Sequence, residues 1–371
     1  MEYIRELIFI CGYATLTFIM AFVLAKPLIR ALIHFKIGKT LREYATDGKK
    51  AEIFNQLHKN KTGTPTMGGL LIWGSVVLVV LISRLLAVFG LGYYDYDPAS
   101  APEVRSLLQR SETWLPLFTL IVTALLGAVD DWFNIKGIGK SKGINVKPKF
   151  ILLTILALLG ALWFYYKLDF ATRPLHIPGL QFLFPFLPTS DIFLGLWYIP
   201  LFILVIISTA HSVNITDGLD GLAGGLLAIA FAGYTIICFA TGKVFLAAFC
   251  ACIVGALGAF LWFNVSPAKF FMGDTGAISL GATLGVIAML TNTVVVLPII
   301  GFIFVIEALS SAIQLTSKKL RGKKVFLVAP IHHHFEALGW PEHNVVMRFW
   351  IIGTVTTVVG VIIALIGRGV Y

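Results

Sequence analysis

The stretch "LFILVIISTAHSVNITDGLDGLAGGLLAIAFAGYTIICFA", residues 201–240, consists of two long apolar runs joined by a short polar segment. Each run predicts a helix that crosses a bilayer, which takes about 17 to 25 apolar residues. Two carboxylates, Asp217 and Asp220, lie where the runs meet, although an acid beside hydrocarbon is costly unless it has a partner or a task. The stretch therefore predicts a helical membrane protein with functional residues at the ends of its helices.

The same pattern recurs along the whole chain. Of the 371 residues, 58% are hydrophobic and only 13% are charged, which is outside the range of soluble globular proteins. We expect an all-α, polytopic integral membrane protein that forms a single transmembrane domain over residues 1–371. About ten spans are predicted, at residues 8–32, 67–89, 114–130, 149–166, 192–210, 219–240, 244–263, 276–291, 294–315 and 346–367.

Basic residues predict the orientation of the chain. They cluster in the loops after the first, third and ninth predicted spans, among them Lys36, Lys39, Arg42, Lys49, Lys50, Lys59, Lys61, Lys136, Lys140, Lys142, Lys147, Lys149, Lys318, Lys319, Arg321, Lys323 and Lys324. The positive-inside rule makes these loops cytoplasmic, so ten spans place both termini outside. The net charge of +10 then reflects topology and attraction to the lipid bilayer. Nucleic acid is a poor partner, because the clusters lack interleaved aromatic residues.

The polar motifs share this predicted face. They are "KTGTPTMGG" (61–69), "AVDDW" (128–132), "NITDGLDG" (214–221), "WFNVSPAKFFMGDTG" (262–276) and "APIHHHFEALGWPE" (329–342). Each lies in or beside a loop that follows an odd-numbered span. We therefore expect one active-site cleft on the cytoplasmic face.

Two motifs predict how the carboxylates are arranged. Asp130 and Asp131 are adjacent on a helix and point about 100° apart, so separate tasks are expected. Asn214, Asp217 and Asp220 are spaced three apart, which predicts one polar stripe on helical or near-helical backbone.

A cation is expected among these acids. Asp274 lies between two glycines just before a span, where it could cap a helix or bind a hard cation. Five carboxylates on one face repel one another unless a cation shares the site. Mg²⁺ is the expected cofactor and Asp274 its candidate ligand, since Mg²⁺ favours one or two carboxylates together with substrate phosphate oxygens.

The run His332, His333 and His334 does not predict zinc. Consecutive side chains on a helix point in different directions, and no cysteine lies on this face. Hydrogen bonding to a phosphate or a sugar is the favoured use of these imidazoles. Acids, lysines and glycine-rich turns at a membrane surface together predict phosphoryl transfer to or from a substrate that is partly lipid.

These motifs resemble a known family. "TPTMGG", "DD", "NITDGLDGLA", "FMGDTG" and "APIHHHFE" followed by "RFW" (348–350) are similar, in this order, to the phospho-N-acetylmuramoyl-pentapeptide transferases. That family belongs to the superfamily of polyprenyl-phosphate N-acetylhexosamine-1-phosphate transferases. The acidic motifs are shared across the superfamily, whereas "APIHHHFE" and "RFW" resemble the muramoyl-pentapeptide branch.

The resemblance implies a reaction. Phospho-MurNAc-pentapeptide would pass from UDP-MurNAc-pentapeptide to undecaprenyl phosphate, giving UMP and lipid I for peptidoglycan synthesis. It also implies Mg²⁺, a bacterial cytoplasmic (inner) membrane location and a homodimer. Direct attack by the lipid phosphate is favoured over a covalent intermediate, because a bound phosphate is already an anionic nucleophile.

The resemblance also implies roles for individual residues. Asp130 matches the aspartate proposed to deprotonate or position the lipid phosphate, with Asp131 beside it, and Asp274 matches the proposed metal ligand. His332 is grouped with these catalytic candidates. The implied substrate-binding residues are Lys61, Thr66, Lys149, Asn214, Asp217, Gly218, Leu219, Asp220, Asn264, Phe271, Gln314, His333 and His334, with either Lys140 or Lys142 near the phosphates. Of these, Lys61, Gly218, Leu219, Asp220 and Phe271 match the uridine pocket.

The ninth predicted span contains "LPIIGFIF" (297–304). Pro298 and Gly301 are expected to bend it, and the bend could open a groove for a prenyl chain.

The nearest alternative is a sister transferase, and a transporter and a protease are less favoured. A sister transferase would use UDP-GlcNAc or another UDP-HexNAc. An ion-coupled transporter would need carboxylates at the membrane midplane, and an intramembrane aspartyl protease would need two aspartates on facing spans.

Overall fold

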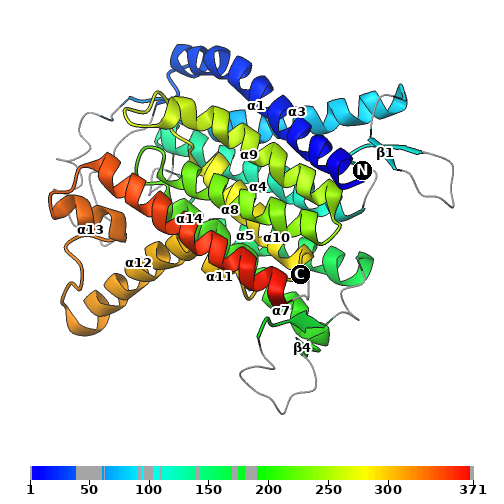
Figure 1. The fold of residues 1–371 in the computed structure, drawn as a ribbon. Helices are drawn as coiled ribbons and strands as arrows, with labels where there is room; N and C mark the ends of the chain where they lie inside the picture. The colour runs from blue at the N-terminus through cyan, green and yellow to red at the C-terminus, as the bar shows by residue number, and fades with distance from the viewer. Residues whose placement is uncertain are drawn as a thin grey trace.

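The fold is built almost entirely from helices (Figure 1). A computed structural model describes residues 2–38, 61, 63–90, 93–95, 103–108, 111–138, 143–168, 174–179 and 190–367. The helical prediction is confirmed, apart from two short antiparallel hairpins that the sequence analysis did not predict. They pair β1 (Tyr93–Asp95) with β2 (Glu103–Arg105), and β3 (Leu175–His176) with β4 (Asp191–Ile192).

The helices follow the apolar runs of the sequence closely. They are α1 (Glu2–His34), α3 (Gly69–Val88), α4 (Ser111–Lys136), α5 (Val146–Leu162), α7 (Tyr198–Thr216), α8 (Leu222–Ala240), α9 (Val244–Asn264), α10 (Asp274–Leu290), α11 (Leu297–Ile300), α12 (Phe302–Arg321), α13 (Ile331–Ala337) and α14 (Glu342–Gly367). A π-helical turn, Trp163–Lys167, extends α5, and a 3₁₀ turn, Gly195–Trp197, precedes α7.

Eight helical segments within the described residues are long and apolar enough to cross a membrane. They correspond to eight of the ten predicted spans and show a multi-pass membrane protein. The span predicted at 276–291 is the 17-residue apolar helix α10. The span predicted at 294–315 is interrupted: α11 ends at Ile300, and α12 begins after Gly301. The predicted bend is thus confirmed, while the count of ten membrane crossings stays a prediction.

Helix α10 forms the centre of the bundle. Its sequence is apolar on all sides, and a helix of that kind is stable only when other helices surround it. It packs against α4, α7, α3 and α8, and almost all of its side chains are buried. Helix α9 is similarly buried and packs against α1, α8 and α3.

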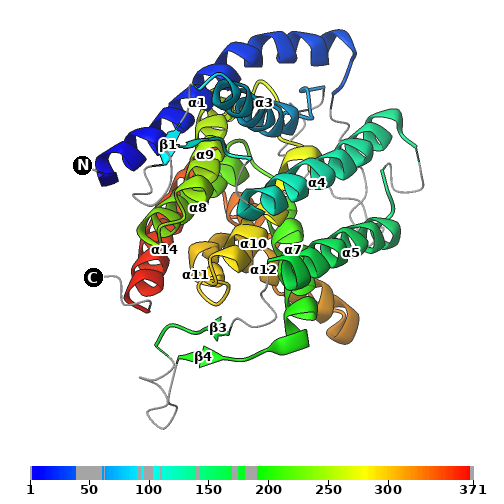
Figure 2. The same ribbon diagram turned by 90° about the vertical axis from the view of Figure 1, so that its right-hand side faces the viewer.

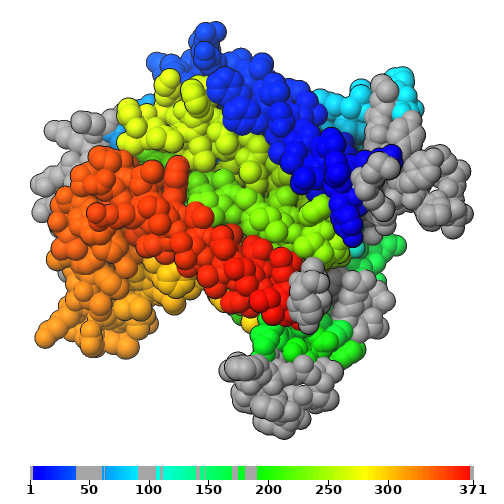
Figure 3. Space-filling model, in the orientation of Figure 1, coloured from blue at the N-terminus to red at the C-terminus, as the bar shows by residue number. Residues whose placement is uncertain are grey.

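The direction in which each helix runs determines which helix ends lie together at each end of the bundle. Helix α1 begins and α14 ends at one end of the bundle, where Figures 1 and 2 mark the two ends of the chain, and α13 lies at the opposite end in Figure 1. Figure 3 shows α12 and α13, in orange, projecting from the main body beside the start of α14. The ends that carry the polar motifs meet near α13, whereas β4 lies toward the other end.

Candidate active site

The central feature of the site is Lys149, near the start of α5. Its ammonium group lies 3.0 Å from Asp130 Oδ2, near the end of α4, and it also donates to Asp274 Oδ2, at the first residue of α10. The ion pairs are largely withdrawn from solvent, because the three side chains are between 8% and 24% exposed. Lys149 therefore holds together two acids that would otherwise repel each other across the helix ends.

Asp131 has a different set of partners. Its Oδ1 accepts the backbone N–H of Asp274 at 3.1 Å, and its Oδ2 accepts that of Thr275 at 3.0 Å. These are the first amides of α10, which have no partner within the helix. The sequence prediction that Asp130 and Asp131 have separate tasks agrees with this geometry.

Close packing of α4 on α10 brings these groups into range. A Cβ atom placed on Gly127 would lie 2.3 Å from the carbonyl oxygen of Asp274, so only glycine allows the two backbones to approach this closely. Gly127 lies about one turn before Asp130. The absence of a side chain there positions both aspartates of α4 against the start of α10.

The segment that joins α7 to α8 contacts the same cluster. Asn214, in the last turn of α7, donates its Nδ2 to Asp274 Oδ1 at 2.7 Å. The helix ends at Thr216, so Asp217 and Asp220 lie in the turn before α8. The prediction of one polar stripe on a helix is therefore wrong: Gly218 and Gly221 interrupt the helix, and Asn214 and Asp220 have different neighbours.

Asp220 belongs to a second charged cluster. Its Oδ1 lies 2.7 Å from Lys61 Nζ, and its Oδ2 accepts the backbone N–H of Ala268 at 3.0 Å. Glu342, the first residue of α14, accepts from Lys61 Nζ at 2.5 Å and from the Asp220 N–H at 2.7 Å. Lys61 is thus bound to two carboxylates that come from distant parts of the chain.

The three histidines of α13 have three separate partners. His332 Nδ1 lies 2.8 Å from Glu307 Oε2 of α12, and His333 Nδ1 lies 2.6 Å from Glu336 Oε2. The backbone N–H of Leu327 donates to His334 Nδ1 at 3.2 Å. Among the described residues, no group of three or more His, Cys, Asp or Glu side chains could hold a metal ion. The absence of zinc from this run stays a prediction.

Two other predicted amide side chains, Asn264 and Gln314, support nearby backbone. Asn264 Oδ1 accepts the N–H of Gly221 at 3.0 Å, and its Nδ2 donates to the carbonyl of Phe270 at 2.8 Å. Gln314 accepts from Val325 and Phe326 and donates back to the carbonyl of Phe326. Both side chains order segments of the site through these bonds.

The remaining predicted residues lie around the start of α10 or in the turn after α7. Thr66 is buried, and its Oγ1 would be 3.0 Å from a Cβ on Gly273. Phe271 pairs its backbone with Pro65 and Gly68. Leu219 is buried. Lys140 and Lys142, the alternatives for a second phosphate-binding lysine, lie outside the described residues, as do Lys39, Arg42, Lys49, Lys50 and Lys59.

Sequence reasoning missed three carboxylates of the site: Glu307, Glu336 and Glu342. Glu307 carried a usable signal, since it is an acid inside a predicted apolar span and such an acid needs a partner. Glu336 and Glu342 lie within the "APIHHHFEALGWPE" motif, but nothing in the spacing indicates that they bind His333 and Lys61.

Comparison with known families agrees with this fold and site. Residues 113–292, which include Asp130, Asp131, Lys149, Asn214 and Asp274, match the sequence model of the family described as glycosyl transferase family 4. The fold is that of a multi-pass membrane protein, and its charged cluster lies within the segment that matches this family.

Curated relatives identify the branch. The phospho-N-acetylmuramoyl-pentapeptide-transferase of Chloroflexus aggregans is 39% identical, over 90% of this chain and 84% of the relative. Proteins with the same name from Geobacillus and Ruegeria pomeroyi are both 37% identical, over 94% and 96% of this chain and 95% and 93% of their own lengths. The chain belongs to the phospho-N-acetylmuramoyl-pentapeptide-transferase family.

The role of Asp131 at the start of α10 is testable. Asp131→Ala leaves the N–H groups of Asp274 and Thr275 without acceptors, and we expect it to lower the free energy of unfolding by about 1 to 2 kcal/mol. Asp131→Asn keeps one acceptor oxygen and should cost less. Thermal unfolding of the purified variants in detergent measures both. Wild-type stability in Asp131→Ala would contradict this role.

Proposed function

We propose that this protein transfers phospho-MurNAc-pentapeptide from UDP-MurNAc-pentapeptide to undecaprenyl phosphate, releasing UMP and forming lipid I. Membership of the family and the named activity of its relatives support the reaction. The observation that carries it is the position of Lys149 between Asp130 and Asp274, where the ends of four helices meet. Transfer between two phosphates needs charge neutralisation and alignment above all, and this cluster supplies both.

The proposed chemistry is a single displacement. An oxygen of the lipid phosphate attacks the β-phosphorus of the UDP-sugar, which also carries the sugar. The bond from that phosphorus to the oxygen bridging the two phosphates breaks, and UMP leaves with this oxygen and its electron pair. We favour this route because the lipid phosphate is already an anionic nucleophile and needs no carboxylate in its place.

Lys149 and Asp130 have complementary parts in this scheme. The Lys149 ammonium is bound to two carboxylates, and incoming phosphates can compete with them for it. Asp130 then accepts or orients the proton of the lipid phosphate, while a backbone N–H, that of Ile144, fixes its Oδ1 at 2.6 Å. The carboxylate is thus held in one orientation while its cationic partner is shared with the substrate.

We also propose Mg²⁺ as the cofactor, with Asp274 as its protein ligand. Asp274 carries carboxylate oxygens at the start of α10, the type of hard donor that Mg²⁺ prefers, and Asn214 Nδ2 donates to one of them, Oδ1. One or two protein oxygens suffice when substrate phosphates complete the coordination. When bound, the ion would neutralise charge on the diphosphate of the donor.

The cluster of Lys61, Asp220 and Glu342 is proposed to bind the uridine end of the donor. Its Asp220 lies on the same segment, residues 214–221, as Asn214, which contacts Asp274. A nucleotide sugar lying along this segment would reach from one charged cluster to the other. Gly218, Leu219 and Phe271 are the proposed neighbours of the base, and His332, His333 and His334 of the phosphates or sugar.

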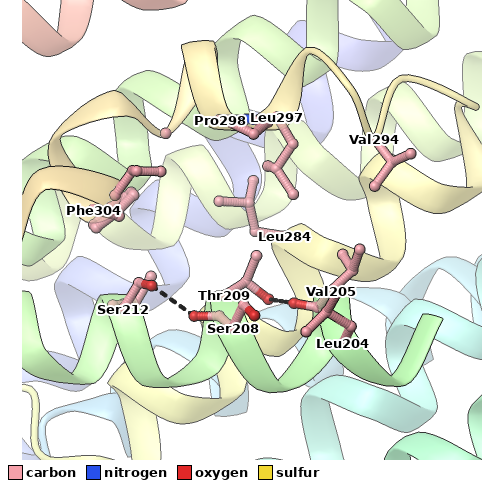
Figure 4. A pocket seen from close by; sticks show the side chains of 13 residues that line it. Leu204, Val205, Ser208, Thr209, Ser212, Leu284, Val294, Leu297, Pro298 and Phe304 are labelled. Carbon is pink, nitrogen blue, oxygen red and sulfur yellow. Dashed lines mark hydrogen bonds between the residues drawn. The ribbon is translucent and has the colours of Figure 1, made fainter. Parts of the chain in front are cut away.

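An apolar cavity of about 220 Å³ beside this segment is proposed to hold the prenyl chain next to the lipid phosphate. Figure 4 shows Ser208, Thr209 and Ser212 of α7 facing Leu297 and Pro298 of α11 across it. The cavity reaches Val213, the residue before Asn214, so a chain inside it would have its phosphate end near Asp274. The break at Gly301 contributes to its wall.

The setting of the enzyme is proposed on the same grounds. Its site would face the cytoplasm, where UDP-sugars are made, with both termini outside, in the bacterial cytoplasmic (inner) membrane. The resemblance to the family supports a homodimer.

The proposed reaction is tested by UMP release from purified protein supplied with undecaprenyl phosphate and UDP-MurNAc-pentapeptide, with and without Mg²⁺. We expect release that requires Mg²⁺ and falls by at least about a hundredfold in Asp274→Asn, because a neutral amide binds the ion and orders the cluster less well. UDP-GlcNAc is the matched alternative donor. UMP release from UDP-GlcNAc alone would instead indicate the sister transferase. No UMP release from either donor would favour the transporter alternative.

Filling the cavity tests the site of the prenyl chain. Ser208→Trp places a large ring inside it, and we expect the KM for undecaprenyl phosphate to rise while the KM for the nucleotide sugar stays near its wild-type value. A short-chain acceptor should be affected less, since it occupies less of the cavity. The control is Leu85→Trp, at an exposed apolar position of α3. Equal effects of the two substitutions would contradict this assignment.

A further inference from the structure

Glu307 and His332 form a hydrogen-bonded contact in the interior of the protein. The two side chains are both 0% exposed, and His332 Nδ1 lies 2.8 Å from Glu307 Oε2. They connect the first half of α12 to the start of α13. Neither the family comparisons nor the sequence motifs assign any task to Glu307.

This contact constrains the protonation of the histidine. An ionised carboxylate can only accept a hydrogen bond, so the proton between the two groups belongs on Nδ1 of His332. A carboxylate buried without a cationic or donor partner would be very costly, and His332 is the partner that the described residues provide. The ring is thereby held in one orientation, with its Nε2 on the far side from Glu307.

The far side of the ring faces the proposed donor-binding segment. A Cβ atom placed on Gly218 would lie 2.3 Å from His332 Nε2, so the imidazole occupies the space that a side chain at position 218 would need. His332 Nε2 is buried and has no hydrogen-bond partner among the described residues. A buried polar atom in this situation indicates a partner that the protein itself does not supply.

We propose that Glu307 is a positioning residue that acts through His332. Its carboxylate fixes the ring and the proton on Nδ1, so that Nε2, directed at the Asp217–Asp220 turn, accepts a hydrogen bond from a hydroxyl group of the nucleotide sugar bound there. The arrangement is that of an acid that orients a functional histidine. This inference rests on the proposed function, in which His332 contacts the donor.

The neighbouring pair offers a comparison within the same helix. His333 and Glu336 are also nearly buried, at 8% and 6%, and are 2.6 Å apart, but both belong to α13. A carboxylate that merely stabilises α13 would resemble Glu336 in its effects. If a carboxylate acts by positioning His332 for the donor, its replacement should cause no further loss of activity once His332 has been replaced.

A double-mutant cycle separates these cases. UMP release is measured at varied concentrations of UDP-MurNAc-pentapeptide for wild type, Glu307→Gln, His332→Gln and the double variant. We expect Glu307→Gln to lower kcat/KM for the donor by about tenfold or more, with the KM for undecaprenyl phosphate unchanged. In the His332→Gln background, the same substitution should cause no further loss. Losses that multiply would overturn the inference.

The control cycle combines Glu336→Gln with His332→Gln. Glu336 bonds to His333 and not to His332, so most of its loss is expected to persist when His332 is already replaced. If both cycles show the same coupling, the effect is a general one on α13, and the positioning role of Glu307 is refuted.

The readouts also separate the inference from the proposed function. Failure of the proposed function appears as a wild-type protein that releases no UMP, whereas failure of the inference appears as an active wild type with multiplying losses. Thermal unfolding identifies a Glu307→Gln protein that does not fold. Glu307→Asp then replaces it: no added loss in the His332→Gln background supports the inference, and an added loss overturns it.

Discussion

The contact of Lys149 with Asp130 and Asp274 is the interaction on which the rest of the site depends. Three helices, α4, α5 and α10, each contribute one charged group to it, and without the lysine the two acids would repel each other at the centre of the bundle. The backbones can meet there because Gly127 has no side chain and because Asp131 satisfies the first amides of α10. Close packing at Gly127, capping by Asp131 and the charge of Lys149 thus all act at the start of α10.

The connection between α7 and α8 links this centre to the rest of the site. Within a few residues, Asn214 reaches Asp274, Gly218 lies against His332, and Asp220 binds Lys61. A ligand bound along this segment would therefore lie close to Asp274, His332 and Lys61. The site is built from distant parts of the sequence, and this short turn contacts each of them.

The sequence predicted the helical bundle and the gathering of the motifs well. Long apolar runs leave few alternatives to membrane-spanning helices, and the alternation of their directions places the motif-bearing ends together. The bend at Gly301 was predictable because proline and glycine weaken a helix locally. The hairpins were not predicted, since strands of two or three residues leave little periodic signal.

The partners of individual side chains could not be predicted. Asp217 and Asp220 have helical spacing, but the glycines beside them end the helix at Thr216. Gln314 and Asn264 were predicted to line the site, but their hydrogen bonds to backbone depend on loops whose course only the folded chain defines. The pairing of Glu307 with His332 joins residues 25 positions apart through tertiary structure alone.

The most direct measurement of the central claim compares two lysines of α5. Lys149 contacts both acids, whereas Lys147, two residues earlier, is exposed. If the Lys149 cluster handles the phosphates, UMP release at saturating substrates should fall by at least about a hundredfold in Lys149→Met and stay close to wild type in Lys147→Met. Comparable activity of the two variants would contradict the account.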